Sequence, residues 1–197
     1  MKYLALDVET TGLDPMTDQV LEIAGVVDDL TQPATKLEDL PTFYAILNHS
    51  RLYGSPYALD MQRRLITAIA HRKDRSQILT PGEVLDQFVT FVDAHGLDRQ
   101  QLLVAGKNVG TFDVPFVRED LFGNDEVKFD YRFLDPTVWF LFPDDVRPPD
   151  QRTCLRRAQL DPRHFPEHTA MGDAHGIVAL MRHGMQRNTG FTLDTTQ

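Results

Sequence analysis

The sequence predicts an α/β fold in which a mixed five-stranded sheet is flanked by helices. Short apolar runs of strand length occur near 3–9, 20–27, 42–47, 102–106 and 131–134. Stretches of helical period lie between and after them, and no repeat or low-complexity tract interrupts the alternation. With 197 residues and 42% apolar content, the chain can bury one sizeable core. We therefore expect a single domain over 1–187, followed by a polar tail over 188–197.

The first run, 3–9, reads as a buried strand that turns acidic at its C-terminal end. Because side chains alternate across a strand, Asp7 and Glu9 should share one face, with a rise of roughly 6.6 Å between them. Their carboxylates would repel each other and be costly to desolvate unless something neutralised them, as a divalent metal ion does. A strand end that opens into solvent accounts for this pair equally well.

The next elements are a polar, proline-containing connection over 28–41 and two helices. Helical spacing of Tyr57, Met61, Leu65 and Ile69 predicts the first helix. Thr80 to Glu83 form a capping box with proline at the first helical position, which predicts the start of the second. The expected buried stripe of this second helix is Val84, Leu85, Phe88, Val89 and Val92.

A helix over 111–121 is expected after the 102–106 run, with Thr111 near its start and Pro115 in its first turn. Asp113 precedes Phe116 and Val117 by three and four residues, so it should lie beside the core-facing stripe and look toward the sheet. An acidic residue also favours a helix N-terminus through the macrodipole. Both interpretations of Asp113 remain open.

The C-terminal part contains a loop near 143–150, a helix from about Gln151 and a helix over 169–187. The last of these is predicted by Ala170, Ala174, Ile177, Val178, Met181 and Met185. Asp173 lies at the edge of that stripe. His168, five residues earlier, is expected on the preceding loop, where an imidazole with a pKa near ~6.5 can accept a proton from water. A solvent-exposed histidine is the alternative, since the chain has 7 of them.

Taken together, the segments LALDVETTGLD, KNVGTFDVPF and HTAMGDAHGIVALM resemble the three motifs of the DEDDh superfamily of 3′-5′ exonucleases. This superfamily includes RNase T, oligoribonuclease and proofreading subunits of bacterial DNA polymerases. The resemblance implies a ribonuclease-H-like fold, in which the first three strands form an antiparallel meander. It also implies metal ligands at Asp7, Glu9, Asp173 and Asp113, and a general base at His168.

The same resemblance suggests how substrate is held. The loop Thr10, Thr11, Gly12 and Leu13 would contact the terminal 3′-hydroxyl through its backbone, with Leu13 wedged against the last base. Asn108 stands five residues before Asp113, as in oligoribonuclease, while Lys107 replaces a histidine that many proofreading-type members carry. Phe112 is a candidate for stacking on a base, although aromatic residues in such settings also build the core.

The expected reaction is hydrolysis of the 3′-terminal phosphodiester of single-stranded DNA or RNA, releasing nucleoside 5′-monophosphates. Oxygen ligands suit two Mg²⁺ or Mn²⁺ ions far better than zinc. We expect one ion to be held chiefly by Asp7, Glu9 and Asp173. A second ion would be held by Asp7 and reached by Asp113 through water, while His168 removes a proton from the attacking water.

Charge and composition restrict the class of protein further. With 20 basic and 29 acidic residues, the net charge is −9, which suits a short grip on one strand end better than a long duplex. Basic groups that could flank a strand, or only solvate a helix, are Arg63, Arg64, Arg72, Lys73, Arg75, Arg152, Arg156 and Arg157. A single cysteine, Cys154, excludes an intramolecular disulfide. No apolar run approaches ~20 residues, so we expect a cytoplasmic enzyme without a membrane segment.

Two alternatives to a free-standing exonuclease remain. The chain could be a proofreading-type subunit with a polymerase partner, or a non-catalytic module that binds nucleic-acid ends. Similarity to RNase T and oligoribonuclease also suggests a homodimer. The choice between DNA and RNA depends on contacts at the 2′ position, which the motifs do not define.

Overall fold

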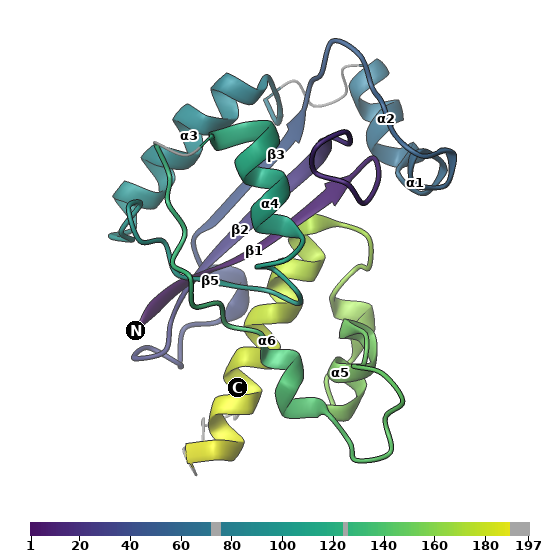
Figure 1. Ribbon diagram of the computed structural model, residues 1–197. Coiled ribbons are helices and arrows are strands. Elements are labelled where there is room, and N and C mark those ends of the chain that lie inside the picture. Colours follow the sequence, from purple (N-terminus) through teal and green to yellow (C-terminus); the bar gives the residue numbers. More distant parts are fainter. Residues whose placement is uncertain (72–75, 124–125, 190–197) are drawn as a thin grey trace.

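A five-stranded mixed sheet forms the centre of the protein, with helices on both of its faces (Figure 1). The computed structural model describes residues 1–71, 76–123 and 126–189. The strand order is β4-β3-β2-β1-β5, and the strands are β1 Lys2–Thr10, β2 Val20–Asp29, β3 Thr42–Leu47, β4 Ile78–Leu79 and β5 Val104–Ala105. β1, β2 and β3 are antiparallel neighbours, while β4 and β5 add in parallel at the two edges. The expected mixed sheet with an antiparallel start is confirmed.

The helices come from the segments between and after the strands. Their bounds are α1 Pro56–Met61, α2 Arg63–Ala70, α3 Pro81–Ala94, α4 Asp113–Val117, α5 Gln151–Arg157 and α6 Ala170–Thr189. A π-helical turn, Arg118–Phe122, continues α4, and short 3-10 turns cover Leu37–Asp39, Pro136–Phe140 and Pro162–His164. No α-helix among the described residues combines the length and apolarity that crossing a membrane requires.

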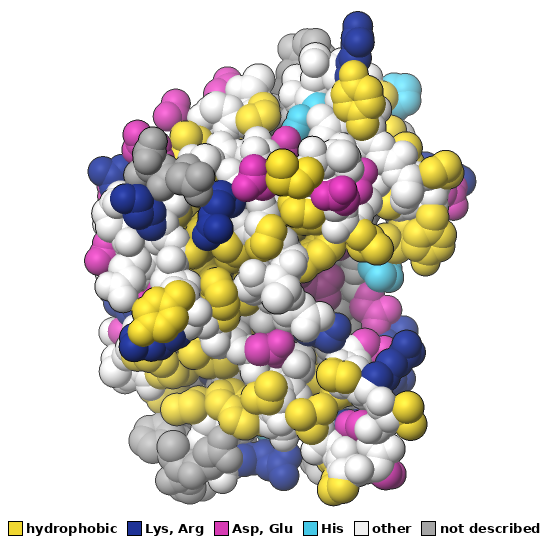
Figure 2. All heavy atoms as spheres, viewed as in Figure 1, with side chains coloured by type: hydrophobic (Ala, Val, Ile, Leu, Met, Phe, Trp, Pro, Cys, Tyr) yellow, Lys and Arg dark blue, Asp and Glu magenta, His cyan; other side chains and the backbone are white. Residues whose placement is uncertain are grey.

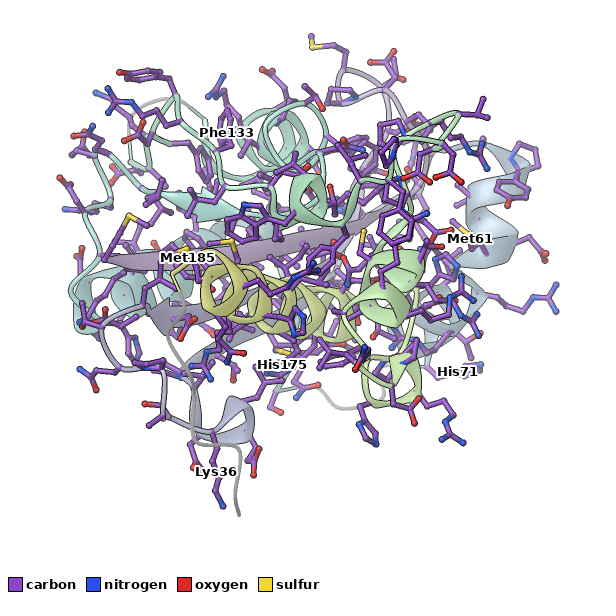
Figure 3. The ribbon with its side chains drawn as sticks, turned by 90° about the horizontal axis from the view of Figure 1, so that it is seen from below. Lys36, Met61, His71, Phe133, His175 and Met185 are labelled. Atoms are coloured by element: carbon purple, nitrogen blue, oxygen red, sulfur yellow. The ribbon has the colours of Figure 1, made fainter. Side chains whose placement is uncertain are left out.

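The two faces of β1 pack against different helices. Leu4, Leu6 and Val8 belong to the core that includes buried residues of α3 and α4. Tyr3 and Ala5 alternate with them and pack with the buried side of α6. Figures 1 and 3 show α6 running along the sheet on this second face. By the same alternation, the next odd-numbered residues of β1 face α6.

The edge strand β5 is much shorter than β1 beside it. It pairs with β1 only at Leu4 and Ala5. Within the described part of the chain, the C-terminal half of β1 therefore has no neighbouring strand on this side, and its backbone groups need other partners. The acidic end of β1 lies in this open part of the sheet.

The capping box before α3 is confirmed. The Thr80 hydroxyl accepts a bond from the Glu83 N–H, and the Glu83 carboxylate accepts one from the Thr80 N–H at 2.8 Å. Two N–H groups that would lack intrahelical partners are satisfied in this way. In the predicted stripe, Val84, Phe88 and Val92 are buried, while Leu85 and Val89 are partly buried against the same core.

The predicted strand over 131–134 is wrong. Only Leu134 pairs with the sheet, through an isolated bridge to Ala105, and residues 131–133 are exposed. The Arg132 N–H instead bonds to the carboxylate of Asp130, which closes a local turn. The sheet instead gains the strand β4, Ile78–Leu79, which was not predicted because two residues are too few to show a period in the sequence.

Three helix predictions also need correction. The single helix expected from Tyr57 to Ile69 is two helices that meet at Gln62, and Tyr57 and Met61 are exposed rather than part of an apolar stripe. The helix expected over 111–121 begins at Asp113 and becomes π-helical after Val117. Helix α6 continues to Thr189, so the predicted tail starts later than 188, and its residues 190–197 lie outside the described part of the chain.

Candidate active site

Three of the predicted carboxylates converge at the end of β1. Asp7 and Glu9 share the α6 face of the strand, and Asp173 lies in the first turn of α6. One carboxylate oxygen from each residue can be chosen so that all of them lie within 4.8 Å of one another. The pairing of a strand face with a helix start therefore brings together groups more than 160 residues apart in the sequence.

Asp113 joins the same site from the opposite side of β1. It is buried at the start of α4, and its Oδ1 accepts a hydrogen bond from the Val8 N–H at 3.0 Å. Because β5 stops short, that N–H has no strand partner, and the Asp113 carboxylate takes the place of one. Asp7, Asp113 and Asp173 all line a cavity of about 430 Å³. Figure 2 shows a hollow on this face with acidic side chains inside it.

Burial of these acids, together with their proximity to one another, raises their pKa values. Burial, followed by the charges of Asp113, Asp173 and Glu9, raises the pKa of Asp7 well above its usual range. Burial and neighbouring carboxylates also raise the pKa of Glu9 to about 7, against opposing contributions from Gln62 and Arg64. The metal-free cluster therefore holds negative charge at a high electrostatic cost.

The other two acids are shifted in the same direction. Burial raises the pKa of Asp113 to about 7, although the Val8 N–H opposes the shift. Burial raises the pKa of Asp173 to about 6, while the imidazole charge and backbone N–H of His168 oppose it. A cation bound among the carboxylates would return all of these pKa values toward or below their usual range.

Two glutamines orient the acids, and sequence reasoning missed both. The Gln62 side chain, buried at the junction of α1 and α2, donates a hydrogen bond to Glu9. The Gln151 amide, at the start of α5, donates to the Asp173 carboxylate at 3.1 Å and to its carbonyl at 3.0 Å. Nothing in the local sequence separates these glutamines from surface glutamines, because their partners are distant along the chain.

Glu22 is a further buried acid beside the site. It is opposite Glu9 in the β1–β2 register and is only 1% exposed. Its carboxylate accepts bonds from Arg64 at 2.9 and 3.1 Å, from the Tyr44 hydroxyl, and from the Ala170 N–H at 2.9 Å. An acidic residue inside the apolar run VLEIAGVV was the sequence signal that could have identified it.

His168 is exposed on the loop that precedes α6, as expected. Its backbone φ of 56° is in the left-handed region, and the neighbouring Thr169 hydroxyl accepts a bond from the Gly172 N–H at 3.2 Å. A Cβ at Gly172 would stand 2.2 Å from the Pro166 carbonyl oxygen, so the glycine lets this loop pack closely on α6. The imidazole is close enough to affect the pKa of Asp173 but is not among the cavity's lining groups.

The predicted 3′-end loop is held largely by internal contacts. Thr10 and Thr11 are buried, and their hydroxyls bond to the Gly12 carbonyl and the Gln19 N–H. A Cβ at Gly12 would stand 2.0 Å from the Asp18 carboxylate, so the glycine allows the backbone to pack closely against the Asp18 side chain. Leu13 is 84% exposed and is the side chain in this loop that faces solvent most fully.

The cavity wall contains the other two predicted contacts. Asn108 is exposed with a φ of 56°, and its N–H donates to Asp135 at 3.0 Å. Phe112 lines the cavity but also packs against Phe116, with ring centroids 5.0 Å apart. Phe112 therefore contributes to the core through Phe116, and its stacking on a base stays a prediction.

Most of the basic residues that were predicted to flank a nucleic-acid strand are paired with side chains of the protein itself. Arg64 pairs with Glu22, Arg157 with Asp145 and Arg152 with Glu167. Arg63 pairs with Asp60 on the exposed side of α2, and the Arg156 guanidinium bonds to the Thr153 hydroxyl. Arg72, Lys73 and Arg75 lie outside the described residues.

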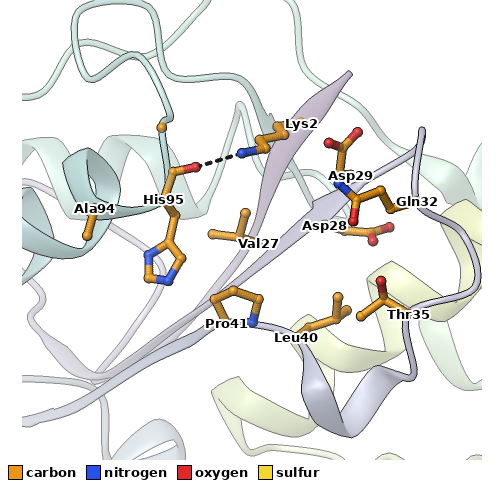
Figure 4. Close-up of a pocket in the computed structure, with 11 residues that line it drawn as sticks. Lys2, Val27, Asp28, Asp29, Gln32, Thr35, Leu40, Pro41, Ala94 and His95 are labelled. Atoms are coloured by element: carbon orange, nitrogen blue, oxygen red, sulfur yellow. Dashed lines mark hydrogen bonds between the residues drawn. The ribbon is translucent and has the colours of Figure 1, made fainter.

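A separate cavity of about 460 Å³ lies at the other end of the sheet (Figure 4). The charged side chains of Lys2, Asp28 and Asp29, which line it, have partners within the protein. Asp28 is paired with Arg182 and accepts from the Tyr3 hydroxyl, and the Lys2 ammonium donates to the His95 carbonyl. This cavity therefore lacks the uncompensated charge that distinguishes the acidic site.

The donor set suits a hard divalent cation. Asp7, Glu9, Asp113 and Asp173 offer only oxygen atoms, which favours Mg²⁺ or Mn²⁺ over zinc. Glu9 and Asp173 each accept a hydrogen bond from a glutamine amide, which is the support that metal-ligating carboxylates commonly have. The cluster therefore passes the chemical test for a metal site.

Solved structures share this architecture. Cell-death related nuclease 4 has a TM-score of 0.63 and 17% identity, over 96% of this chain and 64% of that chain. Exonuclease I from Methylocaldum szegediense has a TM-score of 0.62 and 16% identity, over 96% of this chain and 41% of that chain. Another exonuclease I structure has a TM-score of 0.63 and 15% identity, over 92% of this chain and 40% of that chain. No protein-family model and no curated protein matches the sequence.

These likenesses identify the ribonuclease-H-like α/β fold that the nuclease structures have. Identities of 15–17% carry the fold and not the activity. The chain also spans less than two thirds of the length of each matched chain. The evidence for an activity therefore lies in the acidic site.

Proposed function

We propose that this protein is a metal-dependent 3′-5′ exonuclease that removes nucleoside 5′-monophosphates from single-stranded DNA or RNA. The observation that carries the proposal is the convergence of Asp7, Glu9 and Asp173 within 4.8 Å, with Asp113 on the wall of the same cavity. Four ionised carboxylates carry four negative charges, which two divalent cations would balance, and two such ions can act together on one phosphodiester.

The carboxylates divide naturally between two cations. Asp7, Glu9 and Asp173 would hold the first, and Asp7 with Asp113 would hold the second. Bound divalent cations lower the pKa of water and stabilise negative charge that develops on phosphate oxygens. Gln62 and Gln151 keep Glu9 and Asp173 oriented toward the ions by donating hydrogen bonds to them.

His168 would remove the proton from the attacking water. Its imidazole is exposed, lies next to Asp173 and is attached to a loop whose backbone is fixed by the Thr169 and Gly172 contacts. A neutral imidazole is a suitable base near neutral pH. The negative charge of Asp173 stabilises the imidazolium that forms.

A strand end is the substrate that best fits the charge. A net charge of −9 disfavours an extended grip on duplex phosphates, and the acidic cavity is wide enough for a small ligand. The 3′-terminal nucleotide would lie by the loop from Thr10 to Leu13, with Leu13 against its base. We propose, from family resemblance alone, that the protein acts as a homodimer.

The test is product analysis over time on oligonucleotides labelled at the 5′ end. Matched DNA and RNA strands, single-stranded and duplex, are incubated with Mg²⁺, with Mn²⁺ or with EDTA. The expected result is a ladder that shortens one nucleotide at a time from the 3′ end, with 5′-monophosphates released only when a divalent ion is present.

Other outcomes separate the alternatives. Binding of strand ends without cleavage in either metal would indicate a non-catalytic module and overturn the proposal. A polymerase that co-purifies under mild salt, and whose presence accelerates an otherwise slow cleavage, would indicate a proofreading-type subunit. Internal cleavage products would contradict action at the 3′ end.

A further inference from the structure

A second cavity, of about 560 Å³, adjoins the acidic site. Lys107 lines both cavities and therefore stands at the boundary between them. The second cavity is formed by the loop after Phe142 and by the exposed side of α5, including Arg147, Pro149 and Thr153. A ligand that leaves the acidic site past Lys107 would enter this space.

The acids in the second cavity already have partners within the protein. The Asp145 carboxylate makes two bonds of 2.6 Å to the Arg157 guanidinium. The Asp150 carboxylate caps α5 by accepting from the Thr153 N–H at 2.7 Å. Both acids therefore have hydrogen-bonding partners that a passing anion would not need to displace.

Two of the three bases in the second cavity, Lys107 and Arg147, are not paired with its acids, whereas Arg157 is held by Asp145. Lys107 and Arg147 make no ion pair and no side-chain hydrogen bond within the part of the chain that the structure describes. Lys107 is half-buried, and Arg147 is exposed. The cavity thus presents two unpaired cations, one of them at the boundary with the acidic site, and this arrangement favours an anionic ligand.

Sheet topology gives the ligand a direction. The proposed 3′-end loop lies beside α1, because the Thr11 carbonyl accepts from the Ser55 N–H at 2.9 Å. Lys107 follows β5, on the opposite side of β1. A strand whose last nucleotide lies at Leu13 and whose scissile phosphate lies over Asp7 would continue past Lys107.

We propose that Lys107 and Arg147 bind successive phosphates of the nucleotides 5′ to the scissile bond, in the groove between the 143–150 loop and α5. This inference rests on the proposed exonuclease function and adds a binding subsite to it. The ligand class is a single-stranded polynucleotide of several residues. Because Arg147 lines only the second cavity, it would contact nucleotides farther from the scissile bond than Lys107 does.

The first test measures KM and kcat against oligonucleotide length, from about two to about eight nucleotides of oligodeoxythymidylate. For the wild type, KM should fall as the strand lengthens and fills the groove. For Arg147→Ala, that decrease should be largely lost, so the variant's KM should exceed the wild-type value by about tenfold on the longest strand. Lys107→Ala should raise KM at shorter lengths as well, because it lies closer to the scissile bond.

The second test measures affinity without turnover, by fluorescence anisotropy in Ca²⁺, with intact oligonucleotide recovered as a check. Each lost phosphate contact should reduce the slope of log Kd against log salt concentration by about 0.7. The double variant should therefore lose about 1.4. Matched controls are Lys36→Ala, whose side chain extends away from the body of the protein (Figure 3), and Arg187→Ala at the far end of α6.

The outcomes distinguish the two proposals. A wild type that degrades no oligonucleotide in Mg²⁺ or Mn²⁺ overturns the proposed function. An active wild type whose KM and salt slope are unchanged by Arg147→Ala and Lys107→Ala overturns only the subsite. Equal losses in the two control variants would show a general charge effect and would also reject it.

Discussion

The backbone N–H of Ala170 donates a 2.9 Å hydrogen bond to the buried carboxylate of Glu22. Ala170 is the first residue of α6, so this bond ties the start of that helix to the middle strand of the antiparallel meander. His168 and Asp173 flank the bonded residue on either side. Glu22 therefore acts as a positioning residue for two groups of the candidate site.

Replacing Glu22 should separate its hydrogen-bonding role from its charge. Glu22→Gln retains an acceptor for the Ala170 N–H and loses an ion pair with half-exposed Arg64, at an expected cost of about 1 kcal/mol or less. Glu22→Ala leaves the buried N–H without a partner and should lower the free energy of unfolding by about 2–3 kcal/mol. Urea unfolding and kcat should both show the larger loss in Glu22→Ala. Equal losses in the two variants would contradict the positioning role.

Gln62 should control how tightly Glu9 binds metal. In the protein, the hydrogen bond from the Gln62 amide lowers the pKa of Glu9, which is about 7. Gln62→Leu removes this bond, and the pKa of Glu9 should therefore rise further. Metal affinity near neutral pH should fall by about 10- to 100-fold, measured by calorimetric titration with Mn²⁺. The control Gln87→Leu, on the exposed side of α3, should match the wild type.

Local sequence patterns predicted the parts of the site that depend on local geometry. Asp7 and Glu9 face the same way because a strand alternates its side chains, and His168 precedes α6 because helical period ends before it. The same reasoning placed Asp113 near the sheet. It did not reveal that Asp113 bonds to the Val8 N–H, since that depends on how early β5 ends.

The elements that sequence reasoning missed depend on contacts between distant segments. The strand β4 has two residues and exists only because it pairs with β3 in parallel. Gln62 breaks a helix that appears continuous in the sequence, and it does so where its side chain reaches Glu9. The run 131–134 has the residue types of a strand but is exposed at three of its four positions, so tertiary context overrides propensity.

Asp113 should show separable structural and chemical roles. Asp113→Asn keeps an acceptor for the Val8 N–H, so the fold should be nearly as stable as the wild type while activity falls sharply. Asp113→Ala leaves that buried N–H without a partner and should also cost about 1–3 kcal/mol in the free energy of unfolding. Thermal unfolding and initial rates in saturating Mg²⁺ would measure the two effects. An asparagine variant as unstable as the alanine variant would contradict the proposed substitution for a strand partner.

The metal-free protein should become less stable as pH rises. Glu9 and Asp113 have pKa values of about 7 in the fold, and Asp173 of about 6, against about 4 for such groups in an unfolded chain. The folded state therefore binds more protons than the unfolded state between about pH 4 and about pH 7, so the free energy of unfolding falls across that window. In EDTA, Tm should be several degrees lower at pH 8 than at pH 5.5.

Divalent cations should reverse that dependence. They bind the ionised carboxylates, so Mg²⁺ or Mn²⁺ should raise Tm strongly at pH 8 and little at pH 5.5. Asp7→Asn should weaken both the loss of stability with pH and the response to metal. A wild type whose Tm in EDTA rises with pH from 5.5 to 8 would show that the cluster does not have the raised pKa values.

His168 and Asp7 should differ in which step each supports. His168→Ala removes the proposed proton acceptor but no metal ligand, so kcat should fall by about 10²–10⁴-fold while Mn²⁺ affinity stays near the wild-type value. Asp7→Asn should weaken both, because Asp7 faces both proposed cations. Calorimetry with Mn²⁺ and single-turnover rates in saturating Mg²⁺ provide the two measurements, and the exposed His164→Ala serves as the control. Wild-type turnover in His168→Ala would reject the base assignment. Loss of metal binding in the same variant would instead place His168 among the ligands, because an imidazole that only accepts a proton has no reason to change the affinity for a cation.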